Sequence, residues 1–396
     1  MKATKQIMRS FNKQAILNLF IGKESLDISE IVRKTNLCAA TVSKQISELM
    51  KEGLILEKST GKSCGGRRPM LYCLNGERAY ALSVRITPKG ATVAIVNFNC
   101  SIVYSKTAAQ IIYGFARVRE LMGLLVKSLQ EEHNDLFVKI RAVAFSIPGI
   151  LNYTKNAVLY SAPLGLENFN IAEMVNEIFP FTVRTYIFKD TDALILGEYN
   201  FSSFPPRQSM AYILCEYGVG MSLILKGELF RHDGSSLELG HTTIDMNGKQ
   251  TRPNHIPGAL GALLSEMPAV RRYLDLYEQS HSDFIDPYML DYNDIVNLYI
   301  EKDGIARQVL SEQFRYLTIA IVNVVNLFNP DTVIIGGSLA RLPECIEQVS
   351  ADVKLQVLKP FAAGLNIYAS SFSLSACLLG MASYVFQTEF FKLVQI

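Results

Sequence analysis

Side chains that could contact nucleic acid gather at two places near the N-terminus. The first group, in the opening turns of a predicted helix, is Thr41, Ser43, Lys44 and Gln45. The second is the pair Arg67-Arg68, which follows two glycines in a loop. Hydroxyl, amide and cationic groups of these kinds bind phosphate oxygens and the edges of bases. We therefore interpret both groups as candidate contacts to double-stranded DNA.

The elements that must position the first group form a predicted helix–turn–helix. Residues 28–50 are expected to make two helices separated by a turn at 36–38. In the second helix Val42, Ile46 and Leu49 fall at i, i+4 and i+7, so they form one apolar stripe and leave the opposite face polar. An earlier helix would bury a side made of Ile16, Leu17, Leu19 and Phe20. The polar face of the second helix would then meet base edges and phosphates.

A glycine-rich loop after these helices predicts a β-wing. A short apolar run over 54–56 leads into the loop 61–69, and Leu71-Tyr72 reads as the return strand. The adjacent glycines Gly65 and Gly66 in this loop permit a tight backbone. At the tip of such a wing, Arg67 and Arg68 would reach a minor groove or backbone phosphates.

The charge of the chain is unevenly divided. Residues 1–76 carry 13 Lys and Arg against 6 Asp and Glu, a net of +7, whereas the remainder carries 26 against 31, a net of −5. A basic head on a mildly acidic body is typical of a DNA-binding module joined to a domain with another task. The alternative is a helical domain that docks another protein.

The composition is that of a large globular protein. The chain has 396 residues, of which 49% are hydrophobic, enough for two or three domains with sizeable cores. The first residues lack the apolar run of a signal peptide, and no uninterrupted apolar stretch is long enough to span a membrane. The 7 cysteines are scattered without a Cys-x-x-Cys pair, which fits reduced thiols. We expect a cytoplasmic protein without a membrane partner.

Alternating strands and helices beyond residue 76 predict an α/β body. Strands are expected at 79–86, 91–97, 101–108, 140–147, 181–189, 210–215, 220–225 and 332–335, and helices at 115–133, 191–200, 305–326 and 375–387. Two successive units of this kind suggest two similar lobes around a cleft, with ligands at the carboxyl ends of strands. The expected domains are a winged helix–turn–helix (1–76), a small lobe (77–200) completed by a C-terminal helix (380–396), and a large lobe (201–379).

Four motifs of the body resemble those of the ROK family, whose members are sugar kinases and sugar-responsive repressors. They are Ile147-Pro148-Gly149, Lys189-Asp190-Thr191-Asp192-Ala193, Glu238-Leu239-Gly240-His241 and the segment from Asn329-Pro330 to Gly336-Gly337. The glycine-arginine wing is also similar to that of the family's repressors. The resemblance covers essentially the full chain. It implies a two-lobed, actin-like and ribonuclease-H-like ATPase fold of the ROK sugar kinases behind the winged helix–turn–helix.

The resemblance breaks down where the family's kinases bind phosphate. Those kinases open the body with Asp-x-Gly-Gly-Thr, whose glycines wrap the ATP phosphates and whose aspartate helps to hold the metal. The corresponding residues here are Arg85-Ile86-Thr87-Pro88-Lys89, which offer no carboxylate and no glycine pair, and a proline without an amide donor. Phosphoryl transfer depends on positioning and charge stabilisation. We therefore expect no useful kinase activity and interpret Asp190 as the relic of the kinase base.

The family's structural zinc site is also expected to be absent. Thr251, Pro253 and Ala259 stand where the resemblance implies three cysteines. One histidine cannot make a four-coordinate zinc site, and the spacing of His232 and His255 fits no standard pattern. We therefore expect no metal and no cofactor.

What remains of the family's sugar site is Asp190, Glu238 and His241. Two carboxylates and an imidazole facing one cleft suit paired hydroxyls, because each sugar hydroxyl both donates and accepts. Structural alternatives exist for all three. Asp190 could be a helix N-cap, Glu238 a cap or an ion-pair partner, and His241 a hydrogen-bonded core histidine.

Head and body together lead to one functional hypothesis and two rivals. The hypothesis is a repressor of carbohydrate-utilisation genes that binds a palindromic operator as a dimer or higher homo-oligomer. A sugar or sugar derivative in the cleft between the lobes would release it. The rivals are a sugar kinase of the ROK family and a DNA-binding regulator controlled by a protein partner.

Overall fold

The chain folds into two compact units in a computed structural model. The structure describes residues 2–60, 69–204, 208–232, 237–248, 256–282, 286, 289–371 and 373–391. One unit is Met1–Ser202 together with Leu374–Ile396, and the other is Ser203–Ser373. None of the described helices is both long and apolar enough to cross a membrane.

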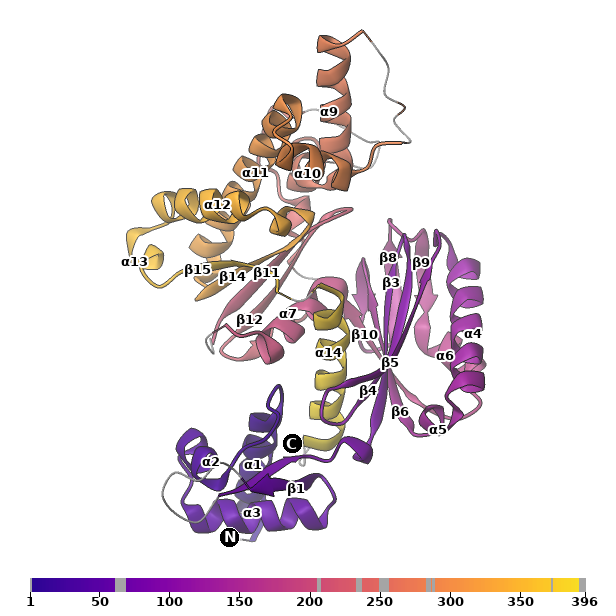
Figure 1. Ribbon diagram of the computed structural model, residues 1–396, viewed down its shortest axis with the longest axis vertical. Coiled ribbons are helices and arrows are strands. Elements are labelled where there is room, and N and C mark those ends of the chain that lie inside the picture. The colour runs from indigo at the N-terminus through magenta and orange to yellow at the C-terminus, as the bar shows by residue number, and fades with distance from the viewer. Residues whose placement is uncertain are drawn as a thin grey trace. The chain divides into compact units, whose positions relative to one another are not determined.

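The first unit begins with the element order of a winged helix–turn–helix. The elements are α1 (Lys2–Phe20), α2 (Ile28–Thr35), α3 (Ala39–Lys51), β1 (Ile55–Thr60) and β2 (Met70–Leu74) (Figure 1). β1 and β2 pair as an antiparallel ribbon. The expected apolar stripe of α3 is confirmed, because Val42, Ile46 and Leu49 are buried, as are Ile16 of α1 and Ile31 of α2.

A five-stranded sheet in the order β10-β6-β3-β4-β5 follows in the same unit. Its strands are β3 (Tyr80–Thr87), β4 (Gly90–Asn97), β5 (Ile102–Ala109), β6 (Ile140–Ile147) and β10 (Arg184–Lys189). β3, β4 and β5 are antiparallel neighbours, whereas β6 and β10 run parallel to β3. The hairpin predicted around Pro88 is confirmed as β3 and β4. The single turn Gly76–Arg78 (η1) connects the head to this sheet.

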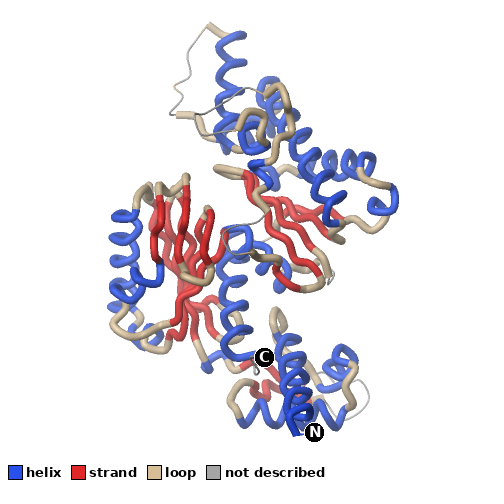
Figure 2. The backbone as a smooth tube through the Cα atoms, turned by 180° about the vertical axis from the view of Figure 1, so that it is seen from behind, coloured by secondary structure: helices blue, strands red, loops and turns tan. Residues whose placement is uncertain are grey.

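Helices cover both faces of this sheet (Figures 1 and 2). Core side chains of β3 and β6 pack with those of α4 (Phe115–Glu132), α5 (Asn134–Phe137) and α6 (Ile171–Ile178). On the other face lie α7 (Asp190–Phe201) and α14 (Ser373–Phe386), which continues as a π-helical turn over Gln387–Phe391.

The C-terminal helix belongs to this lobe from its first turns. The Ser83 hydroxyl of β3 donates to the Leu378 carbonyl of α14 at 2.8 Å, and the Phe188 ring of β10 packs on Tyr384 at 5.2 Å. The boundary expected at residue 380 is too late, because the first unit takes up the chain again at Leu374.

A second, three-stranded antiparallel sheet in the first unit was not expected from the sequence. It consists of β7 (Ile150–Asn152), β8 (Ala157–Ser161) and β9 (Leu166–Asn170). These strands are short and lie between turns, so they carry little periodic signal.

The second unit is built on a sheet in the order β13-β12-β11-β14-β15. The strands are β11 (Met210–Cys215), β12 (Val219–Leu225), β13 (Glu228–Leu229), β14 (Thr332–Gly337) and β15 (Asn366–Ala369). Its helices are α8 (Leu260–Leu264), α9 (Glu266–Ser280), α10 (Tyr292–Ile300), α11 (Gly304–Phe328), α12 (Pro343–Gln356) and α13 (Lys359–Ala362), with single turns η2 (Leu239–His241) and η3 (Ser338–Arg341). The long helix α11 supplies buried residues along most of its length, so it is a central element of this unit's hydrophobic core.

Candidate functional site

The candidate recognition helix α3 is positioned by local signals in the turn before it. Asp27 caps α2, where its Oδ1 accepts a hydrogen bond from the Glu30 amide at 2.8 Å. Asn36 ends α2 in the left-handed conformation, with φ of 56°, a conformation that asparagine adopts more readily than most residues. The chain can then reverse within two residues, and α3 starts at Ala39.

The outward face of α3 carries most of the predicted contact residues. Lys44 is exposed, and Thr41 and Ser43 are half-buried at the same end of the helix. Ser47, one turn beyond Lys44, is also exposed and donates to the Ser43 carbonyl at 3.0 Å. Sequence reasoning stopped at the first turns and missed Ser47, although its spacing from Lys44 predicts the same face.

Gln45 does not lie on this face, so the prediction that it contacts DNA from an exposed position is wrong. Its side chain belongs to a residue only 4% exposed, and its Oε1 has no hydrogen-bond partner. The reason is helical geometry: residue 45 is three residues after Val42 and four before Leu49, so it falls on the apolar stripe.

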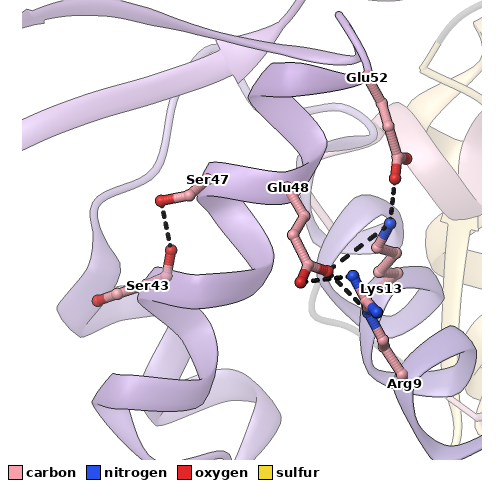
Figure 3. A network of polar contacts seen from close by, with 6 residues as sticks. All are labelled: Arg9, Lys13, Ser43, Ser47, Glu48 and Glu52. Atoms are coloured by element: carbon pink, nitrogen blue, oxygen red, sulfur yellow. Dashed lines mark hydrogen bonds and ion pairs between the residues drawn. The ribbon is translucent and has the colours of Figure 1, made fainter. Parts of the chain in front are cut away.

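Acidic residues of α3 are turned toward α1 by ion pairs (Figure 3). Arg9 Nε donates to Glu48 Oε2 at 2.9 Å, and the buried Lys13 pairs with both Glu48, at 3.8 Å, and Glu52. The carboxylates of Glu48 and Glu52 face α1. The outward side of α3 therefore keeps the positive charge of Lys44. The sequence offered a signal for this contact, since two acids four residues apart on a DNA-facing helix require cationic partners.

The two wing arginines lie outside the described residues. The structure describes β1 up to Thr60 and resumes at Pro69, just before β2. The antiparallel pairing of β1 and β2 means that the segment carrying Arg67 and Arg68 joins the two strands of a ribbon. Their contact with DNA stays a prediction.

Asp190 is the first residue of α7, directly after β10. Its Oδ1 accepts a hydrogen bond from the Thr191 amide at 2.8 Å, while the N-cap position belongs to Lys189. Burial raises the pKa of Asp190 above its ordinary value, against the opposing effects of Lys189, the Thr191 amide and Arg85. Asp190 therefore interacts electrostatically with Arg85.

The surroundings of Asp190 hold further buried polar groups. Asp192, only 4% exposed, accepts a hydrogen bond from the Tyr153 hydroxyl at 3.0 Å. Glu198, further along α7, is fully buried. Helix α7 thus buries the carboxylates of Asp192 and Glu198, and buried carboxylates are costly unless they are hydrogen-bonded or paired.

Glu238 and His241 lie together on the turn η2 of the second unit. The His241 amide donates to the Glu238 carbonyl at 3.0 Å. Glu238 directly precedes the turn and His241 ends it, so the two residues are close along the chain. Gly240 allows this turn to approach β12, because a Cβ there would lie 2.5 Å from the Val219 carbonyl oxygen.

The solvent exposure of Glu238 and His241 bears on the structural roles that were considered for them. His241 is exposed, so it is not a core histidine. Glu238 is half-buried and occupies the N-cap position of η2 without capping through its side chain. Asp190 belongs to the other unit.

Within the described part of the chain, no three His, Cys, Asp or Glu side chains gather as a metal site. Ala259, where the resemblance implies a cysteine, ends the loop before α8, and His232, which was considered as a substitute ligand, is exposed. Thr251, Pro253 and His255 lie outside the described residues.

The motifs of the body agree with the comparison to known families. The ROK family model matches residues 82–388, from β3 into the C-terminal π-helical turn. The chain belongs to the ROK family. The head at 1–76 lies outside the matched range, so the family match concerns the two α/β lobes.

Three known proteins place this ROK chain among regulators and kinases. The xylose repressor of Caldicellulosiruptor bescii is 27% identical over 368 residues, which cover 89% of this chain and 91% of that protein. The crystal structure of a ROK family transcriptional regulator, a homologue of the E. coli MLC protein, superposes with a TM-score of 0.77 at 20% identity, covering 95% of this chain and 97% of the other. A ROK glucokinase from Streptomyces griseus, solved with glucose and AMPPNP, reaches 0.63 at 17% identity and covers 77% of this chain and 99% of its own. The two structural likenesses show the shared fold.

Proposed function

We propose that this ROK protein is a sugar-responsive transcriptional repressor that binds operator DNA through its N-terminal head. The observation that carries the proposal is the outward face of α3, with Lys44 exposed between Ser43 and Ser47, on a head of net charge +7 joined to a ROK body. The similarity to a xylose repressor over nine-tenths of the chain supports it. Two such heads in a homodimer would bind the half-sites of a palindrome.

The same proposal assigns no kinase activity to the body. A kinase base must accept a proton from the substrate hydroxyl while a loop and a metal hold the phosphates. Here Arg85 lies near Asp190, and Pro88-Lys89 form the turn where the family's kinases use glycines. A guanidinium beside the carboxylate favours its ionised form but also competes with a sugar hydroxyl for it.

The effector is proposed to bind through Asp190, Glu238 and His241. Their acceptor and donor groups suit sugar hydroxyls. A ligand shifts the protein between two states only by the difference of its affinities for them, typically about 1–3 kcal/mol.

Helix α7 supplies a physical route from this site to the head. It starts at Asp190 and ends at Phe201. Near that end, a Cβ on Gly22 of the head would lie only 2.2 Å from the Asn200 carbonyl oxygen. A displacement of Asp190 along the axis of a packed helix would therefore reach the backbone of the head.

Selection from a pool of genomic fragments tests DNA binding by the purified full chain. We expect enrichment of a palindromic sequence and loss of its binding when the effector sugar is added. No enrichment above a control protein would refute the repressor proposal.

Replacing Lys44 with Ala should weaken operator binding and lower the slope of log affinity against log salt by about 0.9 for one lost phosphate contact. The double replacement of Arg67 and Arg68 with Ala should do the same more strongly. Lys127→Ala is the matched control, because Lys127 is an exposed lysine of α4, outside the head. Equal affinities and slopes for the Lys44 and Lys127 variants would remove α3 from the interface.

The kinase rival is tested by ATP turnover across a panel of sugars. The persistence of Asp190 at the position of the family's catalytic aspartate is what favours it. We expect no sugar-dependent turnover. Turnover that disappears in Asp190→Asn would establish the kinase instead.

A further inference from the structure

A groove on the first unit shares no residue with the candidate DNA-binding face or with Asp190, Glu238 and His241. It lies where β9 leads into α6, beside the first turns of α4, and has a volume of about 310 Å³. Helices α4 and α6 pack side by side there (Figure 1). The lining includes Phe115 and Arg119 of α4, Glu167 and Phe169 of β9, and Glu173 and Glu177 of α6.

Local interactions set the shape of the groove. Asn170 ends β9 and caps α6: its Oδ1 accepts a hydrogen bond from the Glu173 amide at 3.2 Å, and its Nδ2 donates to Glu173 Oε1 at 2.8 Å. An ion pair between Arg119 and Glu177 joins α4 to α6. The walls are therefore a paired strand, a capped helix and a second helix bound to the first.

Large apolar side chains line the groove and continue beside it. Phe169 packs against the core of the lobe, whereas Phe115 is 62% exposed. Tyr113 and Ile111, two and four residues before Phe115, are 69% and 82% exposed. Exposed apolar side chains gathered in this way mark surfaces that bind another molecule. Aromatic side chains often supply much of the binding energy at such surfaces.

The segment that carries Tyr113 and Phe115 is fixed to the loop before β9. The Gly114 amide donates to the Leu164 carbonyl at 2.7 Å. The Tyr113 ring lies against Gly165, because a Cβ there would be 2.5 Å from the Tyr113 Cζ atom. An anchor that is already ordered loses little conformational entropy when a partner binds.

The charge of the groove is negative. Among the described residues that line it, Glu167, Glu173 and Glu177 supply three carboxylates against the one guanidinium of Arg119, which already pairs with Glu177. This excess repels the phosphates of DNA, so the groove is not a second operator contact. A lysine or arginine side chain gains from the carboxylates and also from the face of a nearby aromatic ring.

We propose that this groove binds a segment of a partner protein in which a large apolar side chain stands next to an arginine or a lysine. The apolar side chain would pack on Phe115 and Phe169, and the cation would pair with Glu167 and Glu173. Such a partner adds a protein input to the body, separate from the proposed sugar effector. No residue of the head takes part, so the site does not depend on operator binding.

Selection from a displayed library of random peptides against the immobilised full chain tests the groove. We expect enrichment of peptides that combine a large apolar residue with an adjacent arginine or lysine. An enriched peptide, labelled with a fluorophore, is then titrated with the full chain. Phe115→Ala and Glu167→Gln should each weaken its binding about tenfold, for the loss of an anchor and of a charge partner. Added salt should weaken it as well.

Leu124→Ala and Glu131→Gln are the matched controls, because both residues are exposed on α4 and lie outside the lining. Both control variants should bind the peptide as the parent does. Phe115 and Glu167 are themselves exposed, so their variants should fold, and thermal unfolding checks this.

Enrichment of acidic peptides, or of none, overturns the proposal. A peptide that the Phe115 and Glu167 variants bind as tightly as the controls overturns it too. Sedimentation of the chain alone tests a different occupant: self-association that Phe115→Ala abolishes and Leu124→Ala retains would assign the groove to a second copy of the chain. Operator binding is measured separately, so a failed repressor proposal leaves this result intact.

Discussion

Gln45 occupies a costly position at the residue scale. It is one of the buried polar residues of the head, and its Oε1 lacks a hydrogen-bond partner. An unsatisfied buried amide costs about 1–3 kcal/mol. The residue sits beneath the outward face of α3, so its effect on DNA binding can act only through the position of the helix.

Gln45→Leu should therefore raise the free energy of unfolding by about 1 kcal/mol, because the stripe of α3 becomes fully apolar. Operator affinity should change by less than for Lys44→Ala. Chemical denaturation and a DNA titration measure the two effects. A stable variant that lost operator binding would return Gln45 to the interface.

The position of Asp190 also lowers the stability of the fold, because its carboxylate is desolvated there. Burial raises its pKa in the folded protein above the unfolded value. For an acid with a raised pKa, stability falls as pH rises from the unfolded pKa to the folded one, because the unfolded chain then releases the proton first. The destabilisation caused by burial therefore grows as the pH rises above the ordinary pKa of an aspartate.

Asp190→Asn should consequently raise Tm at pH 7, and this gain should shrink as the pH falls toward the ordinary pKa of an aspartate. Thermal unfolding of the variant and the parent at a series of pH values, from the ordinary pKa of an aspartate (about 3.9) up to neutral pH, tests the sign. A loss of stability at neutral pH would mean that the ion pairing with Arg85 and Lys189 outweighs burial.

Two glycines set the contact between α7 and α14 at the scale of elements. A Cβ on Gly197 would lie 2.1 Å from the Ala376 carbonyl oxygen, and one on Gly380 would lie 2.2 Å from the Ala193 carbonyl oxygen. Backbone therefore touches backbone where the helices cross, which fixes α7 against the C-terminal helix. Any movement of α7 must involve α14 as well.

Gly380→Ala should lower the free energy of unfolding by about 1–3 kcal/mol, since the added methyl group forces the helices apart. Gly123→Ala on α4 is the matched control: no atom lies within 4 Å of its new Cβ. That change should stabilise the protein by about 0.5–1 kcal/mol through helix propensity. Equal effects of both substitutions would contradict the close crossing.

The division of charge matters at the scale of the whole molecule. The head carries a net charge of +7 and the body a net charge of −5, so the head is the part of the chain that DNA attracts. A repressor with two such heads binds best when its half-sites lie on the same side of the duplex.

Inserting about five base pairs between the half-sites of the selected operator turns them by half a helical turn and should reduce affinity strongly. Inserting about ten base pairs returns the half-sites to the same side of the duplex and should recover part of the affinity. Gel-shift titrations of the three operators measure this. If the two insertions had the same effect, the heads would not be coupled through one dimer.

The sequence by itself determined the features that repeat at a fixed spacing. The apolar stripe of α3, the hairpin of β3 and β4, and the long helix α11 each carry a local period, and the structure confirms them. The ROK family followed from motifs in their order along the chain. Local spacing and order are properties of a chain before it folds, so they can be read from it directly.

Tertiary structure alone decided the contacts between distant residues. It turned Gln45 inward and paired Lys13 with Glu48 and Glu52. It also placed Arg85 near Asp190 and formed a groove between β9, α4 and α6. These outcomes depend on which surfaces pack together, and that choice is made by burial summed over the whole fold, which no local pattern contains.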